Sequence, residues 1–246
     1  MNTKRTHWLA VGMVWATVAL ASDATNDPVW KTTLTAGGTL TDGNTETMKG
    51  NASLLVEGEK ASLGSLRTGA EINYGENKVD GENRTDTDNG KVFANVKKTI
   101  SPMTFAYGDV TASRDDLANL DYRIVLGPGL GLYAVKSDRT TLSFEAGPSY
   151  KWEKKDRVSD DAWTLRAAQR FEFKFSDTSR CWQAAEFLAQ FEDLDDNLLN
   201  AEVGVEADIM SGLSLRLVVE DKYDNQPSEG KKSNDVSVTA GISLKL

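Results

Sequence analysis

The chain has 246 residues, with 37 acidic side chains against 28 basic ones, one cysteine and one histidine. The net charge of −9 argues against a nucleic-acid ligand, because phosphates are bound by clustered lysine and arginine. A single cysteine excludes a disulfide framework and any metal site built on paired cysteines. Beyond the N-terminus, the longest uncharged apolar-rich stretch is residues 124–135, too short for a membrane helix of about 20 residues.

The N-terminus predicts a cleaved secretory signal peptide. Lys4 and Arg5 precede an uncharged stretch at residues 8–21, whose end carries the small residues of a signal-peptidase site. We place cleavage after Ala21, with Ala24 as the alternative site, and cleavage also removes His7, the only histidine. A retained membrane anchor is the other interpretation of this segment.

From Trp30 onward, apolar and polar residues alternate with a period of two, which predicts strands with one apolar and one polar face. In the last segment, apolar residues occupy every even position from Val236 to Leu246. In chain order the twelve predicted strands are residues 30–41, 47–57, 65–75, 91–98, 105–113, 122–135, 140–151, 162–175, 180–191, 197–209, 213–223 and 236–246.

The connections between these strands alternate in length. Short turns fall at residues 59–64, 100–104, 136–139, 176–179 and 210–212, and longer polar loops at 76–90, 114–121, 153–161, 192–196 and 224–235. Bacterial outer-membrane barrels have short periplasmic turns, longer external loops and an even number of strands. We therefore predict an all-β fold, a single transmembrane antiparallel β-barrel of about 12 strands. A soluble secreted β-sandwich is the rival prediction.

This reading predicts three regions: a signal peptide at 1–21, a short periplasmic segment at 22–29 and the barrel at 30–246. Aromatic residues at the strand ends are expected to form two girdles at the membrane interfaces. The external girdle would hold Tyr74, Tyr122, Tyr150, Trp152, Trp163 and Tyr223, and the periplasmic girdle Trp30, Phe105, Tyr133, Phe173, Phe175 and Trp182.

On each predicted strand, the positions that alternate with the apolar residues carry charges of both signs. These charges cannot face hydrocarbon and are expected to face the lumen. These residues are Lys49, Glu57, Arg67, Glu71, Arg123, Glu145, Lys151, Arg166, Arg170, Glu172, Glu202, Glu206, Arg216 and Glu220. They would line a narrow wet channel or form an ion-paired plug that holds the barrel in shape. The sequence leaves both alternatives open.

The inward parity also carries glycines at 127, 129, 131 and 147. These glycines lie on two predicted strands joined by the turn at residues 136–139. In the hairpin that the turn forms, paired residues have numbers that sum to 276, so Leu130 lies opposite Ala146 and Ala134 lies opposite Leu142. The same register places Pro128 opposite Pro148, where two amide donors are missing and we expect a bulge or a bend. The glycines would either control curvature or make room for long side chains from the opposite wall.

Cofactor and metal sites are not expected. The run from Gly127 to Gly131 lies inside a strand rather than at a strand-to-helix turn, so it does not indicate a nucleotide site. The segment from Asp86 to Gly90 lacks the third carboxylate and the terminal glutamate of a calcium loop.

Several short motifs resemble one family, the salt-induced outer membrane proteins that contain the domain of unknown function 481. The residues that carry the resemblance are Asp42, Gly43, Asn44, Arg114, Asp115, Asp121, Tyr122, Arg123, Gly127, Gly129, Gly131 and Gly147. The resemblance covers roughly residues 30–246. It implies a Gram-negative outer-membrane barrel, a link to salt or osmotic response, and no established catalytic residues.

These observations predict a narrow, weakly selective channel that affects outer-membrane permeability. The alternative is a plugged structural or surface-interaction barrel whose acidic loops contact lipopolysaccharide, ions or partner proteins. We do not expect an enzyme, because known barrel hydrolases use a histidine base that the mature chain lacks. Periplasmic chaperones and the barrel-assembly machinery are the partners expected during biogenesis.

Overall fold

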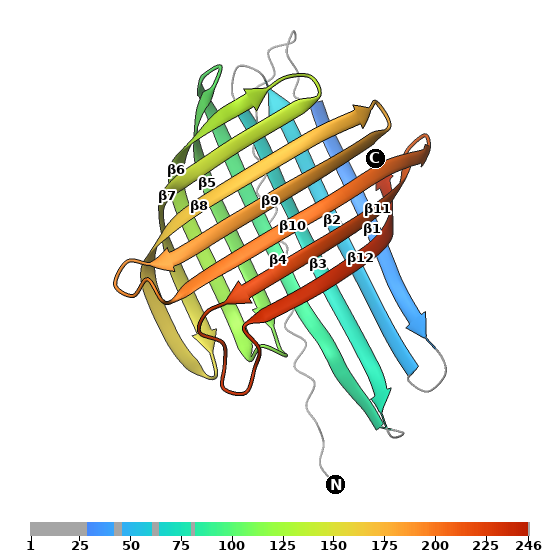
Figure 1. The fold of residues 1–246 in the computed structure, drawn as a ribbon, viewed down its shortest axis with the longest axis vertical. Helices are drawn as coiled ribbons and strands as arrows, with labels where there is room; N and C mark the ends of the chain where they lie inside the picture. Colours follow the sequence, from blue (N-terminus) through green and yellow to red (C-terminus); the bar gives the residue numbers. More distant parts are fainter. Residues whose placement is uncertain (1–28, 42–45, 61–63, 80–81, 246) are drawn as a thin grey trace.

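A computed structural model describes residues 29–41, 46–60, 64–79 and 82–245, which form a closed barrel (Figure 1). The twelve strands of the described chain are β1 (Val29–Thr41), β2 (Glu46–Lys60), β3 (Gly64–Val79), β4 (Glu82–Ser101), β5 (Thr104–Asp115), β6 (Leu120–Lys136), β7 (Thr140–Lys155), β8 (Val158–Ser176), β9 (Ser179–Gln190), β10 (Asn197–Met210), β11 (Leu213–Asp224) and β12 (Asn234–Lys245). The predicted signal peptide and the motif residues Asp42, Gly43 and Asn44 lie outside the described residues.

Each strand pairs antiparallel with its neighbours in the chain, and β1 pairs with β12 to close the sheet. The predicted twelve-stranded barrel is therefore confirmed, and the β-sandwich is excluded because its two sheets would remain separate. No helix among the described residues is long and apolar enough to cross a membrane.

The burial pattern is the reverse of that in a water-soluble domain. Large apolar side chains such as Ile72, Leu130 and Val238 are 65–67% exposed on the outer face. Ser214 and Ser243, which face inward, are fully buried. An apolar exterior around a polar interior is the arrangement that a bilayer stabilises.

The β6–β7 hairpin follows the predicted register over most of its length. Leu130 pairs with Ala146, and no ladder pairs occur between 127–129 and 147–149, where the prolines were expected to disturb the sheet. One pair was wrong: Leu142 lies opposite Val135 instead of Ala134, because a bulge follows Tyr133. The bulge adds one residue to β6 beside the turn.

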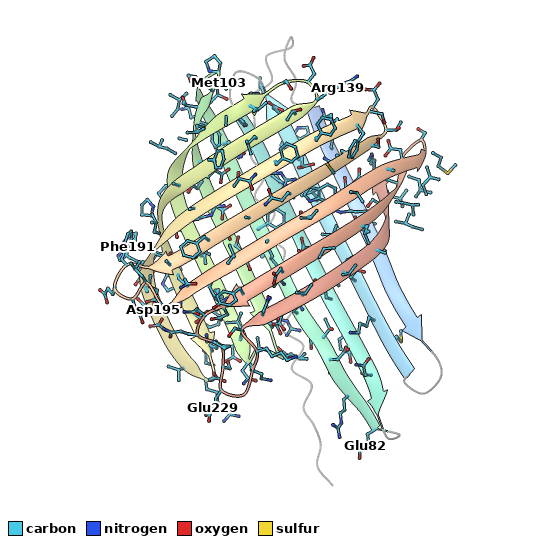
Figure 2. All side chains as sticks on the ribbon, viewed as in Figure 1. Glu82, Met103, Arg139, Phe191, Asp195 and Glu229 are labelled. Atoms are coloured by element: carbon cyan, nitrogen blue, oxygen red, sulfur yellow. The ribbon has the colours of Figure 1, made fainter. Side chains whose placement is uncertain are left out.

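The segment at residues 76–90 is not a loop, contrary to the prediction. β3 continues to Val79 and β4 begins at Glu82, so the two strands form a long hairpin. Its polar residues hid the alternation that defines the shorter strands. Figure 2 shows Glu82 at the hairpin tip, at the same end of the barrel as Asp195 and Glu229, whereas Met103 and Arg139 lie at the opposite end.

Three aromatic residues assigned to the periplasmic girdle face inward instead. Phe105 is 1% exposed and packs on Tyr133, with 4.8 Å between ring centroids. Trp182 is also buried, and its Nε1 donates a hydrogen bond to Glu202. A position near the end of a strand does not decide which face of the sheet a side chain lies on, because successive side chains alternate between the two faces.

Candidate functional site

The barrel encloses a cavity of about 1580 Å³. Twelve of the fourteen charged residues predicted to face the lumen line it: Lys49, Glu57, Arg67, Glu71, Arg123, Glu145, Arg166, Arg170, Glu172, Glu202, Glu206 and Glu220. Arg216 lines a small adjoining pocket, and Lys151 is buried in the wall with 2% exposure.

Arg166 on β8 is the centre of one ion-pair network in the lumen. Its guanidinium lies 3.0 Å from Glu145 and 2.8 Å from Glu186, and 3.8 Å from Asp109. Lys97 Nζ approaches Glu145 from β4 at 2.7 Å. The network links β4, β5, β7, β8 and β9, so it connects strands that are not neighbours in the sheet.

A second network lies nearer the short turns. Arg180 is 3.5 Å from both Glu172 and Glu206, and Lys245 Nζ is 3.1 Å from Glu206. Arg170 lies 3.9 Å from Glu172. This network runs along the wall from β8 to β12.

On the other side of the barrel, Arg67 on β3 forms an ion pair with Glu57 on β2, with 3.2 Å between the charged atoms.

Aromatic rings lie flat against the inner wall, each seated on a glycine of the neighbouring strand. A Cβ added to Gly131 would lie 2.3 Å from the ring of Phe105, and one added to Gly204 would lie 2.0 Å from the ring of Trp182. Gly129 accommodates Tyr107 in the same way. Gly129 and Gly131 thus make room for rings on the adjacent strand, rather than for side chains from the opposite wall, whereas Cβ atoms added to Gly127 and Gly147 would meet the paired strand at Pro148 and Pro128.

Lysine and arginine side chains form cation–π contacts with the faces of these rings that point into the lumen. Lys97 Nζ lies 4.5 Å from the centroid of Phe105, and the Arg216 guanidinium 4.6 Å from that of Trp182. Such contacts hold long basic side chains against the wall and keep them from crossing the lumen.

The external end of the lumen is bridged by Arg123. Its guanidinium binds Glu153 on β7 and lies 3.2 Å from Asp224 on β11, five strands away. Below this bridge, Val125, Leu188 and Leu198 form a small buried apolar cluster inside the barrel.

The β11–β12 loop at residues 225–233 folds against three other external loops. Ser228 is 4% exposed and its hydroxyl donates to the Ala118 carbonyl at 2.9 Å. Asn225 donates to the Asp195 carbonyl at 2.7 Å, and Lys155 Nζ donates to the Gln226 carbonyl at 2.5 Å. The loop therefore covers part of the external mouth.

The described motif residues lie along β5, β6 and β7. Asp115 accepts hydrogen bonds from the amides of Leu117 and Ala118 at 3.1 Å, which shapes the β5–β6 turn. Arg114 lies 2.5 Å from Asp88, and Asp121 lies 2.8 Å from Lys154. Tyr122 is exposed on the outer face. The described motif residues thus form part of the external rim and the part of the inner wall where aromatic rings pack on glycines. They contain no cluster of reactive groups.

Sequence reasoning missed five members of the lumen networks: Lys97, Asp109, Arg180, Glu186 and Lys245. All five follow the inward parity of strands that were recognised, so alternation alone would have found them. Among the described residues, no group of three or more histidine, cysteine, aspartate or glutamate side chains is arranged to hold a metal ion.

A closed antiparallel barrel with an apolar exterior and a charged lumen has the fold of an outer-membrane β-barrel. The chain belongs to the family described as "Protein of unknown function, DUF481", which matches residues 34–245. A comparison with curated proteins finds no significant match.

Solved structures with a similar fold are outer-membrane barrels. The NanC porin superposes with a TM-score of 0.53 at 11% identity, covering 87% of this chain and 100% of the porin. The KdgM porin superposes with a TM-score of 0.48 at 10% identity, and the match covers 89% of this chain and 99% of the porin. The translocator domain of the autotransporter NalP from Neisseria meningitidis superposes with a TM-score of 0.45 at 14% identity, and the match covers 89% of this chain and 88% of the translocator domain. At these identities the likeness concerns the fold.

Proposed function

We propose that the protein is a narrow, weakly selective channel of the Gram-negative outer membrane that passes small ions and solutes. The observation that carries this proposal is the cavity of about 1580 Å³, whose lining includes residues near both ends of the barrel, such as Asp138 at the β6–β7 turn and Lys231 in the β11–β12 loop. A continuous polar lumen is what a diffusion channel requires.

Weak selectivity follows from how the lumen charges are arranged. Glu145, Glu186 and Asp109 surround Arg166, and Glu206 lies between Arg180 and Lys245. Because carboxylates and cations neutralise each other over short distances, neither sign dominates the field along the path.

Recording from the purified protein in planar bilayers tests this proposal. We expect discrete conductance steps with a small preference between cations and anions. Replacing Arg170 by glutamate should shift the reversal potential toward cation selectivity. Silent bilayers over a wide range of salt concentrations would contradict the channel proposal and leave a plugged barrel.

The second candidate function is a surface-interaction barrel, in which the lumen is only structural. Its support is the β3–β4 hairpin, because β4 pairs with β5 only from Asn89 onward, so residues 82–88 extend past the neighbouring strand. Its polar tip would contact lipopolysaccharide, ions or partner proteins. Under this proposal, deleting residues 77–85 abolishes the cellular phenotype while neutralising lumen charges leaves it unchanged.

The proposal includes export through a signal peptide at residues 1–21, a role under changing salt, and no catalytic activity. Cell fractionation tests the location, since an integral barrel stays in the outer-membrane fraction until detergent is added. Growth of a deletion strain across a salt series tests the role. Hydrolysis of a lipid or peptide by the purified barrel, lost on one side-chain change, would contradict the absence of catalysis.

A further inference from the structure

The seam that closes the barrel is much shorter than the neighbouring ladders. Five residue pairs join β1 to β12, from Thr33–Lys245 to Gly37–Gly241, whereas eleven pairs join β12 to β11. In the part of the chain that the structure describes, residues 234–240 pair with β11 alone and residues 38–41 pair with β2 alone. Figure 1 shows β1 and β12 side by side near the C-terminus and diverging toward the external end.

The open part of the seam lies at the depth of the outer leaflet. Tyr223, in the external girdle position of β11, pairs with Asn234, so the β12 residues that follow lie on the membrane side of that girdle. Val236 and Val238 are 64% and 67% exposed on the outer face, as expected for contact with lipid.

Unpaired backbone amides are not tolerated in hydrocarbon unless protein or water reaches them. Water reaches these, because Gly38 and residues 236–240 line the lumen cavity. The cavity therefore extends to the edges of β1 and β12, where the wall is not sealed by hydrogen bonds.

The two sides of this opening differ in chemistry. Val236, Val238 and Ala240 present apolar groups to the membrane, whereas Ser237 and Thr239 alternate with them and face the lumen. Basic residues at this end of the cavity are Lys222, Lys231 and Lys232. Asp224 and Asp235 line the same end, so the interior is polar and carries charges of both signs. Such an interior behind an apolar rim matches a molecule that has a charged, phosphate-bearing headgroup and an acyl chain.

We propose that the β1–β12 seam is a lateral portal that binds an amphipathic lipid. The phosphate-bearing headgroup enters the lumen beside Lys222, Lys231 and Lys232, and the acyl chains remain in the outer leaflet along Val236 and Val238. The portal gives the barrel a lipid ligand in addition to the solutes of the proposed channel.

Fluorescence quenching in liposomes tests the portal. Cys181 is first replaced by serine, and a polarity-sensitive fluorophore is attached to Thr239→Cys at the seam or to Thr111→Cys as the control. Thr111 lines the same cavity but lies on β5, which is paired on both sides at this position. With a quencher on the phospholipid headgroup, we expect a loss of fluorescence at position 239 that position 111 does not show.

Equal quenching at both positions, or none at either, would overturn the proposal. Disulfide-linked dimers of Thr239→Cys would show instead that a second copy of the chain occupies the seam, and would also overturn it. Ser237→Cys supplies a second seam position if Thr239→Cys does not fold. Replacing Lys231 and Lys232 by glutamine should reduce the quenching by anionic lipid. The assay needs no ion current, so its outcome is independent of the channel recordings.

Discussion

Lys97 Nζ lies 2.7 Å from Glu145 Oε1, although β5 and β6 separate their strands in the sheet. The contact therefore spans the concave inner surface of the wall and joins strands that share no hydrogen bonds. Both side chains are largely hidden, with 16% and 9% exposure. The ion pair therefore ties β4 to β7 along the inner surface of the wall.

Replacing Arg166 by methionine should strongly destabilise the barrel. The change leaves the carboxylates of Asp109, Glu145 and Glu186 close together without their shared cation, and breaking a buried pair costs about 3–5 kcal/mol. Urea unfolding in detergent measures the loss. Lys154→Met is the matched control, because its pair with Asp121 is exposed and worth about 0–1 kcal/mol. Equal stability of the two variants would contradict the role of the network.

Gly204→Ala should destabilise the barrel, because the new Cβ would lie 2.0 Å from the ring of Trp182. Overpacking of this kind costs about 1–3 kcal/mol. A Cβ added to Gly108 meets no atom within 4 Å, so Gly108→Ala should leave stability unchanged or slightly raised. The temperature at which each variant loses its fast-migrating form on a denaturing gel reports the difference. If both variants convert at the same temperature, the glycine is not needed to seat the ring.

Removing the bridge between Arg123 and Asp224 should widen the external mouth. We expect the double variant Arg123→Gln, Asp224→Asn to show larger single-channel conductance than the unmodified protein, because the 3.2 Å contact spans five strands. Arg114→Gln is the control, since its partner Asp88 lies on the adjacent strand and Arg114 is 54% exposed. An unchanged conductance in the double variant would place the narrowest point of the lumen elsewhere.

Acid should release the β11–β12 loop from the mouth. The neighbouring Ser228 hydroxyl of the β11–β12 loop and a hydrogen bond from Asn119 hold the pKa of Asp156 below its ordinary value of 3.8. A lowered pKa means that the contact is complete above pH 3.8 and is lost as the pH falls through the lowered value. We expect conductance to rise as the pH falls below 3.8. Asp156→Asn should remove this step, and a step that persists in this variant would implicate another group.

Alternation along the chain was enough to predict a closed barrel of twelve strands. In β12, apolar residues at 236, 238, 242 and 244 face outward and Ser243 is buried, as the period of two requires. The β6–β7 register was predicted from the turn and from the alternation, and it shifts only at the two ends of the hairpin, beyond Tyr133 and before Tyr122. Local sequence carries this information because every strand meets the same two solvents, lipid outside and a polar lumen inside.

Other features depended on the tertiary structure. The sequence placed Phe105 and Trp182 in a girdle, whereas their positions on β5 and β9 turn them inward, where they pack on Gly131 and Gly204 of neighbouring strands. Contacts such as Lys97 with Glu145 join strands that no local pattern relates. The short β1–β12 seam depends on where the first and last strands meet after the whole sheet has curved. By itself, the sequence determined which face of each strand meets lipid. The closed sheet decided which charges meet across the lumen, because those distances depend on the curvature of all twelve strands together.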